Sequence, residues 1–313
     1  MRALHLLGAL AVSTTLLAAL GCEKERTTIT VFPDGSGKIE IKDTLGKQIS
    51  SFALMMAEGD EKKQEVAAQT IHKKLATWEG VCAWSEVKAA VTDAEEISGS
   101  AVGYFEDISK LKRADETSLH EFKWTKNADG GFTIEETQSD KKKDEDAPKK
   151  DPADSFLKKM PDEQLDMAVT MTTSMLEGLQ IDRVIVMPGD VTEIAGAQKK
   201  EGRKATMTIS DKELAELIKK SYKRGAELRK KIDDGETTEE KAKAELNAEF
   251  KDVMKSLKAT CKAGDVTAEH KENKTALEAA KKAYAGSATE KKVKEAKENK
   301  PKMPGGGKHE EDE

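Results

Sequence analysis

The chain has 313 residues, of which 36% are charged and only 4% are aromatic, and its formal net charge is −6. This composition is typical of several small cores with exposed helices and solvated linkers, and it argues against one large dense core. Acidic and basic residues are interspersed, so no basic field exists to bind nucleic acid. After residue 22 no apolar run approaches the ~20 residues of a membrane-spanning helix, so we expect the rest to be soluble.

Residues 1–22 have the three parts of a secretory signal. Arg2 supplies a positive start, residues 3–20 are almost wholly apolar or small, and Gly21-Cys22 precede an abruptly polar stretch. Small residues before the cleavage point complete this form, which predicts a signal peptide over residues 1–21. Two alternatives stay open. The segment is just long enough to be an uncleaved anchor beside a bystander Cys22, or the protein is secreted in soluble form.

The string Ala19-Leu20-Gly21-Cys22 resembles the lipobox of bacterial lipoproteins, with Ala19 where the usual pattern has Leu. The resemblance implies that the Cys22 sulfur receives a diacylglycerol, that cleavage occurs before Cys22, and that the new amine is acylated with a fatty acid such as palmitate. Stable anchoring takes two or more acyl chains. A multiply acylated Cys22 would therefore hold the chain on a membrane of the cell envelope, facing the periplasm or the exterior.

Two cysteines remain, Cys82 and Cys261. An oxidising envelope allows them to pair, and a bridge would tie the C-terminal helices to the N-terminal sheet with a gain of roughly 2–4 kcal/mol. The alternative is two unpaired thiols, each buried as a small hydrophobe. Only a Cα separation below about 7 Å permits the bridge, so both hypotheses stay open.

Residues 22–137 predict an N-terminal α+β region. Residues 27–32 and 38–42 alternate apolar and polar side chains around Pro33-Asp34-Gly35, which predicts a β-hairpin. Apolar residues at helical spacing between Leu45 and Trp78 predict one interrupted amphipathic helix or two. Four further strands with short turns indicate an antiparallel sheet with one solvated face; they are expected at residues 81–91, 98–105, 118–125 and 131–137.

The rest of the chain is expected to alternate between charged linkers and helices. Residues 138–158 are dominated by Lys, Asp and Glu and predict a flexible loop. Residues 159–210 predict a helix and two or three strands that complete the α+β domain. Ser210 and Thr237 each begin a capping-box pattern, which predicts a helical hairpin within a helical region over residues 211–285. Its charges fit a solvated face better than a coiled-coil seam. Residues 286–313 are expected to be a disordered tail.

Residues 181–209 resemble the second half of the LppM-type domain of bacterial lipoproteins, through Pro188-Gly189, Val191, Gly196 and the strand at 205–209. The hairpin at 27–42 resembles the start of that domain, and residues 81–112 resemble uncharacterised envelope lipoproteins. Met207 stands where the motif has an aromatic residue. The resemblance implies a lipid-anchored α+β domain and contact with envelope lipids, with no catalytic residues to carry over.

The sequence contains no motif that predicts catalysis or metal binding. No zinc spacing and no nucleophile elbow occur, and the nearest string, Gly35-Ser36-Gly37, lies in the predicted hairpin turn. The four histidines after residue 22 are each alone in their neighbourhoods and are interpreted as surface or satisfied groups; they are His72, His120, His270 and His309. We therefore predict no catalytic residue, no metal and no cofactor.

Trp84 and Tyr104 are the candidate contact residues, because they lie on adjacent predicted strands. By alternation Trp84 shares a face with Glu86 and Lys88, the polar side of its strand. An exposed Trp there would mark a lipid or partner surface. The alternative is that a helix covers this face and that Trp84 belongs to the core.

Together these observations predict an α+β fold: an antiparallel sheet packed with amphipathic helices, followed by a C-terminal helical extension. The leading hypothesis for function is a non-enzymatic envelope lipoprotein with an interaction or structural role, held to the membrane by Cys22 and contacting envelope lipids or another envelope protein. The first alternative is a module that binds a lipid or another hydrophobic ligand in an apolar pocket of several hundred Å3. An undetected envelope enzyme is the third.

Overall fold

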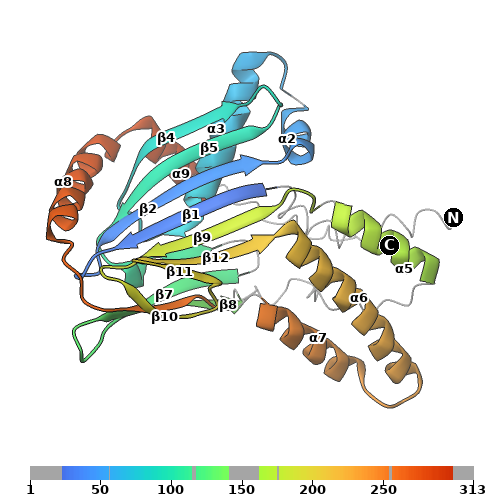
Figure 1. The fold of residues 1–313 in the computed structure, drawn as a ribbon. Coiled ribbons are helices and arrows are strands. Elements are labelled where there is room, and N and C mark those ends of the chain that lie inside the picture. The colour runs from blue at the N-terminus through green and yellow to red at the C-terminus, as the bar shows by residue number, and fades with distance from the viewer. Residues whose placement is uncertain are drawn as a thin grey trace, which may run out of the picture.

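The computed structural model describes residues 23–55, 57–114, 118–140, 162–174, 176–253 and 256–298. It confirms the predicted α+β class, with two antiparallel-rich sheets and helices on either side of the larger one (Figure 1). The expected signal peptide and Cys22 lie outside the described residues, and so does most of the expected charged loop, because β8 continues to Asp140 and the next described residue is Asp162.

The larger sheet has seven strands, and β1 lies at its centre. Its strands are antiparallel except for β1 and β9, the one parallel pair among the described strands. In spatial order they are β11 (Lys199–Glu201), β12 (Lys204–Ser210), β9 (Gln180–Val186), β1 (Glu23–Val31), β2 (Gly37–Leu45), β5 (Ile97–Phe105) and β4 (Ala83–Val91).

The smaller sheet has six strands and packs against the inner face of the larger one. Apolar side chains from both sheets form one continuous core, which contains Ile39 and Phe105 from the larger sheet and Ile134 from the smaller, all fully buried. In spatial order its strands are β10 (Val191–Ala195), β13 (Lys258–Cys261), β8 (Phe132–Asp140), β7 (Ser118–Lys126), β6 (Lys112–Ala114) and β3 (Trp78–Glu79).

The predicted hairpin at the start of the chain is confirmed. Val31 pairs with Gly37, and the Phe32 N–H donates to the Ser36 carbonyl across 2.8 Å. Gly35 adopts a φ of +83°, which glycine accepts without steric cost. A short 3-10 helix, η1 (Ile108–Lys110), packs beside this turn, where the Ile108 N–H donates to the Gly35 carbonyl.

The amphipathic segment after β2 forms two helices, α2 (Lys47–Leu54) and α3 (Asp60–Ala76). Trp78, expected at its end, lies instead in β3. α3 covers the inner face of the larger sheet at β4 and β5, where Gly99 makes room for it. A Cβ on Gly99 would lie 2.3 Å from the Ile71 side chain, so only glycine permits this close approach.

The expected helical region contains a strand that sequence periodicity did not reveal. β13 lies between helices and pairs with β8 and β10, so the C-terminal part of the chain completes the smaller sheet. Four residues with only two apolar side chains give too short a pattern to recognise. The following helix, α8 (Thr267–Tyr284), packs on the outer face of β4 and β5 through Leu277 and Ala280.

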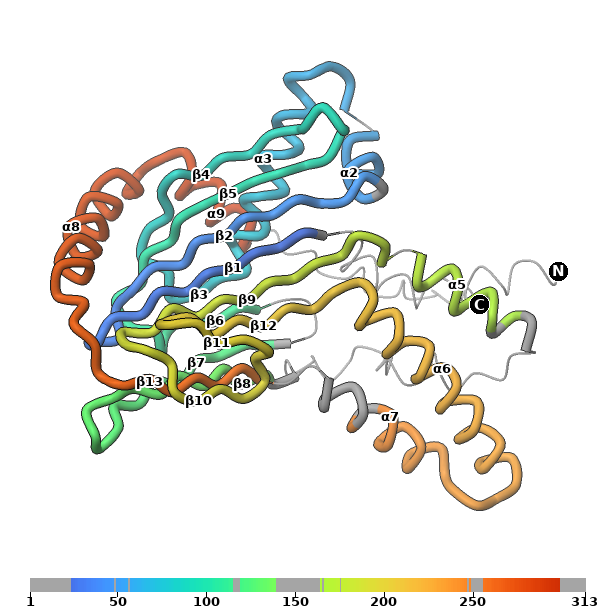
Figure 2. Tube along the Cα trace, in the orientation of Figure 1, coloured from blue at the N-terminus to red at the C-terminus, as the bar shows by residue number. Residues whose placement is uncertain are grey.

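The prediction of a disordered tail over 286–313 is wrong for its first part. Residues Ala288–Glu298 form helix α9, which lies against α3 behind the larger sheet (Figure 2). Its single buried apolar side chain, Val293, is 3% exposed and joins the main core. One buried apolar side chain on an otherwise charged helix does not produce a periodic pattern that predicts the helix from sequence. Tertiary packing nevertheless stabilises α9. Residues 299–313 lie outside the described residues.

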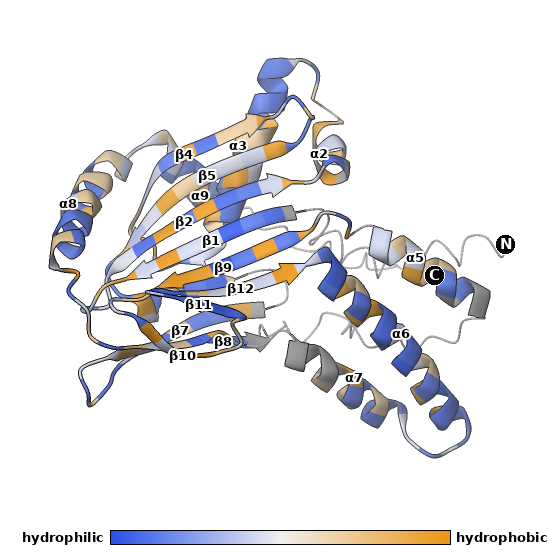
Figure 3. Cartoon of the chain, in the orientation of Figure 1, coloured by the Kyte–Doolittle hydropathy of each residue, from blue (hydrophilic) through white to orange (hydrophobic). Residues whose placement is uncertain are grey.

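Three helices form an arm that extends from one end of the larger sheet. They are α5 (Asp162–Ser174), α6 (Asp211–Asp233) and α7 (Glu239–Val253). In Figure 3, hydrophilic residues predominate along the coloured parts of α6 and α7, with apolar residues recurring between them. The predicted capping box at Ser210 and Glu213 is confirmed. At α7 the capping hydroxyl belongs to Thr238, one residue later than predicted, and accepts from the Lys241 N–H.

Cys82 and Cys261 are both free and do not form the bridge considered above. Cys82 is exposed and lies just before β4 at the edge of the larger sheet, whereas Cys261 is buried in β13 of the smaller sheet. Burial raises the pKa of the Cys261 thiol, which further lowers its reactivity.

Iodoacetamide is therefore expected to modify Cys82 in the folded protein and to modify Cys261 only after unfolding. Peptide mass spectrometry of native and denatured samples measures this difference directly. The free-thiol arrangement is contradicted if both cysteines resist the reagent until a reductant is added, because that result requires a disulfide.

Candidate functional site

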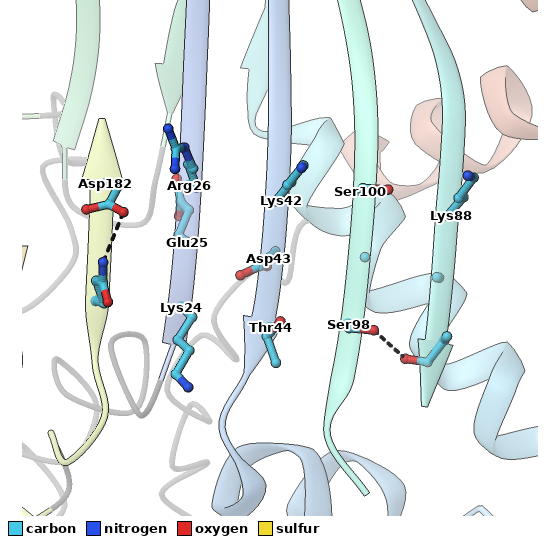
Figure 4. A pocket seen from close by; sticks show the side chains of 14 residues that line it. Lys24, Glu25, Arg26, Lys42, Asp43, Thr44, Lys88, Ser98, Ser100 and Asp182 are labelled. Carbon is cyan, nitrogen blue, oxygen red and sulfur yellow. Dashed lines mark hydrogen bonds between the residues drawn. The ribbon is translucent and has the colours of Figure 1, made fainter. Parts of the chain in front are cut away.

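An open groove of about 500 Å3 crosses the outer face of the larger sheet, on the face that α3 does not cover. Residues of five neighbouring strands line it, from β9 through β1, β2 and β5 to β4 (Figure 4). The groove lies at the end of the sheet where β1 begins, because Lys24 pairs with both Thr44 and Gln180. Its lining includes basic side chains and hydroxyls, among them Lys42, Thr44, Lys88, Ser98 and Ser100, together with the acidic side chain of Asp182.

Four basic side chains in the groove have no acidic partner among the described residues. Lys24, Arg26, Lys42 and Lys88 are exposed, and no ion pair is formed by any of them within that part of the chain. We refer to these four residues as the basic groove. Asp182, an acidic side chain in the lining of the groove, accepts from Thr208 Oγ1 at 2.8 Å and from Gln180 Nε2 at 3.0 Å.

The opposite faces of the same strands carry acidic side chains that are buried. Because successive residues of a strand point to opposite faces, Glu25 and Asp43 point inward, each with 2% of its side chain exposed. Lys74 of α3 approaches both, with its Nζ 2.9 Å from Glu25 Oε2 and 2.7 Å from Asp43 Oδ2. Arg113 of β6 donates twice to Glu25, at 2.7 and 3.1 Å.

This buried network of two carboxylates and two cations joins β1 and β2 to α3 and β6. Burial by itself acts to raise the pKa of Glu25, but Arg113 and Lys74 outweigh it and hold the pKa well below its ordinary value. Glu25 therefore stays ionised. The network fixes the start of β1 against both α3 and the smaller sheet, so the basic groove lies on a rigid base.

A second buried charge cluster lies farther along the interface between the sheets. Glu136 Oε1 lies 2.8 Å from His120 Nδ1 and accepts from Arg183 Nη1 at 2.7 Å. Burial acts to raise the pKa of Glu136, and the adjacent Arg183 lowers it below its ordinary value. His120 is thus a satisfied buried group, as predicted.

The interior between the sheets is nearly filled. The two cavities beside the His120–Glu136 cluster hold about 20 and 10 Å3, which is close to the space that a single water molecule needs. Neither can admit an acyl chain. The apolar pocket of several hundred Å3 that a lipid carrier requires is therefore not found in the described part of the chain.

Large apolar side chains are exposed at the same end of the molecule as the basic groove. Phe52 and Met55 follow β2 on and just after α2 and are 76% and 67% exposed; Met167 and Met171 on α5 are 68% and 39% exposed. α2 begins two residues after Leu45, which pairs with Glu23, and α5 leads into the start of β9. Figure 1 shows both helices at this end.

Trp84 and Tyr104 do not form an exposed contact surface. Trp84 is 5% exposed in the main core and Tyr104 is 8% exposed beneath α8. A β-bulge between Ser85 and Lys88, with Glu86 at a φ of +51°, reverses the alternation along β4. Trp84 therefore points inward although Lys88 points outward, and the alternative that placed Trp84 in the core is confirmed.

A serine, a histidine and an aspartate meet at the β1–β2 turn, but their geometry is not that of a hydrolase. Ser36 Oγ donates to Asp34 Oδ1 at 2.6 Å, and His270 Nε2 lies 3.0 Å from Asp34 Oδ2 and 3.3 Å from Ser36 Oγ. A catalytic triad uses the two ring nitrogens separately, one for serine and one for aspartate. Here one nitrogen faces both, and His270 stacks on Phe32, so the cluster fastens α8 to the turn.

Comparison with known proteins yields no relative: no family model, no curated protein and no solved structure matches the chain. The resemblance to lipoproteins and to the LppM-type domain stays a prediction from sequence. In the described ranges, no group of three or more His, Cys, Asp or Glu side chains could hold a metal ion. No helix within those ranges is long and apolar enough to cross a membrane.

Sequence reasoning missed the basic groove, although part of its signal is readable. Lys24, Arg26 and Lys42 occupy alternate positions on two strands of a hairpin, which places them on one face. Lys88 could not have been added to them, because the bulge in β4 decides which way it points.

Proposed function

We propose that this chain is a non-enzymatic lipoprotein of the bacterial cell envelope, anchored through acyl groups on Cys22. The observation that carries the proposal is the position of Cys22. It ends the apolar segment 3–20, and β1 begins at the next residue, Glu23. β1 is the central strand of the larger sheet, so an acylated Cys22 would hold the folded body against the membrane without a linker.

The filled interior supports an interaction or structural role over ligand transport. Cavities of about 20 and 10 Å3 between the sheets are too small for a lipid, so the part of the chain that the structure describes offers no support for the carrier alternative. Among the described residues, the Asp34–Ser36–His270 cluster does not support the enzyme hypothesis, because its geometry is not that of a catalytic triad.

The helical arm starts at the anchored end of the body. Ser210, the last residue of β12, pairs with Gln180, which pairs with Lys24. α6 therefore leaves the body close to the anchor, and the arm is available for contacts near the membrane surface. Its own small cores, centred on Tyr222 and Leu246, keep α5, α6 and α7 together.

Replacing Cys22 by alanine is the test of the anchor. In bacterial cells fed a fatty-acid analogue, we expect the wild-type protein to carry the label and to sediment with membranes, and Cys22→Ala to lose the label completely. Cys82→Ala is the matched control, because it also removes one cysteine and should retain full labelling. Label on Cys22→Ala equal to that of the wild type would overturn the proposal.

A further inference from the structure

We propose that the end of the body where β1 begins is a docking surface for an anionic lipid bilayer, with the basic groove contacting lipid phosphates and the exposed side chains of α2 and α5 entering the headgroup layer. This inference rests on the proposed anchor but goes beyond it, because it assigns an orientation to the body and a ligand chemistry to the groove.

Charge complementarity is the first argument. Lys24, Arg26, Lys42 and Lys88 converge on one open face without an acidic partner in the described residues, although the chain as a whole has a net charge of −6. Basic side chains held near an anionic membrane surface are attracted to it within about one Debye length, ~8 Å at physiological ionic strength. Ser100 and Thr44 add hydroxyl donors to the same wall, which suits phosphate oxygens, whereas the Ser98 hydroxyl donates to the Ala90 carbonyl at 3.5 Å.

The second argument is that Cys22, the proposed site of acylation, is only two residues before Lys24 in the sequence. Lys24 is two residues beyond Cys22, and two residues of extended chain span about 7 Å at most. A membrane that holds Cys22 therefore lies within reach of Lys24, and through the strand pairing also of Thr44 and Gln180. The basic groove is at the end of the sheet that faces the lipid.

The exposed apolar side chains are the third argument. In the described part of the chain the exposed large apolar side chains all lie on α2 or α5 or directly after α2, at the groove end of the sheet; they are Phe52, Met55, Met167 and Met171. Apolar side chains beside basic ones are typical of surfaces that lie in the membrane interface. At the far end, α8 covers the outer face of the sheet and the exposed cations there are not accompanied by such residues.

The test is a lysine footprint of the full lipidated protein reconstituted into vesicles. Acetylation of each lysine is measured by mass spectrometry in phosphatidylcholine vesicles and in vesicles that also contain phosphatidylglycerol. We expect Lys24, Lys42 and Lys88 to react roughly fivefold more slowly in the anionic vesicles, a factor typical of one basic side chain at such a surface. Lys262, Lys271 and Lys282, at the far end, should be unchanged.

A matched pair of triple variants separates the effect of the basic groove from the effect of the protein's net charge. Arg26→Gln/Lys42→Gln/Lys88→Gln should lose the protection of Lys24, whereas Lys262→Gln/Lys271→Gln/Lys282→Gln, with the same change in charge, should keep it. All six side chains are exposed, so both variants should melt within a few degrees of the wild type.

Three results would overturn the proposal. The first is equal acetylation in the two kinds of vesicle, which means that the groove does not recognise anionic lipid. The second is equal protection in neutral vesicles with free inorganic phosphate, which points to a soluble anion. The third is protection in detergent alone, which points to a protein segment over the groove. The acyl anchor is tested separately by flotation: a protein that does not float with neutral vesicles lacks the proposed anchor.

Discussion

Replacing Trp84 by alanine is expected to lower the free energy of unfolding by about 3–5 kcal/mol, the usual cost of removing a large aromatic side chain from a core. Trp84 is 5% exposed and fills the space beside Gly103, where even an added Cβ would lie 2.7 Å from its ring. Denaturant titration followed by the fluorescence of Trp78 and Trp124, which pack in or against the same core, measures the loss.

Phe52→Ala is the matched control for this prediction. Phe52 is 76% exposed, and its removal should change the free energy of unfolding by less than about 0.5 kcal/mol. If the Trp84 variant is as stable as the wild type, Trp84 is not a core residue, and the bulge in β4 that turns it inward is contradicted.

Replacing Arg113 by methionine is expected to cost about 3 kcal/mol or more. The change leaves Glu25 and Asp43 buried with Lys74 as the single cation between them, and an uncompensated buried charge is strongly destabilising. The adjacent Lys112 provides the control, because its ion pair with Glu121 is more than a third exposed on both sides. Lys112→Met should leave the free energy of unfolding close to that of the wild type, because solvent screens an exposed ion pair.

The two variants should also differ in their response to acid. The folded-state pKa of Glu25 lies below its ordinary value, so its contribution to stability is fully present above about pH 4.3 and is lost as the pH falls further. Protonation of Glu25 relieves the unpaired charge in Arg113→Met. The stability difference between this variant and the wild type should therefore narrow below about pH 4, and a difference that grows in acid would contradict the network.

Local patterns in the sequence predicted most of the elements but not the way they assemble. The hairpin at Pro33–Gly37 and the Ser210 capping box depend on neighbouring residues alone, and both are confirmed. The second sheet is assembled by long-range pairing, with β13 joining β8 over a separation of more than a hundred residues. Tertiary packing decides which strands pair, and the periodicity of apolar residues in one sequence does not predict it.

The candidate site was hidden for a related reason. Lys24 and Lys88 are far apart in the chain and lie on the same face because β1, β2, β5 and β4 are neighbours in one sheet. Trp84 was assigned to the polar face of its strand by strict alternation, and the bulge at Ser85–Lys88 breaks that alternation. Neither the bulge nor the order of the strands has a clear signature in this sequence. The apolar segment before Cys22, by contrast, is a local pattern that can be recognised from the sequence alone.

The membrane anchor at Cys22 is the central claim, and the intact mass of the protein extracted from bacterial membranes tests it most directly. The account predicts a mass equal to residues 22–313 plus a diacylglycerol and one further acyl chain. A mass equal to the complete unmodified chain from Met1, or to a chain that begins at Cys22 without any acyl group, would contradict it.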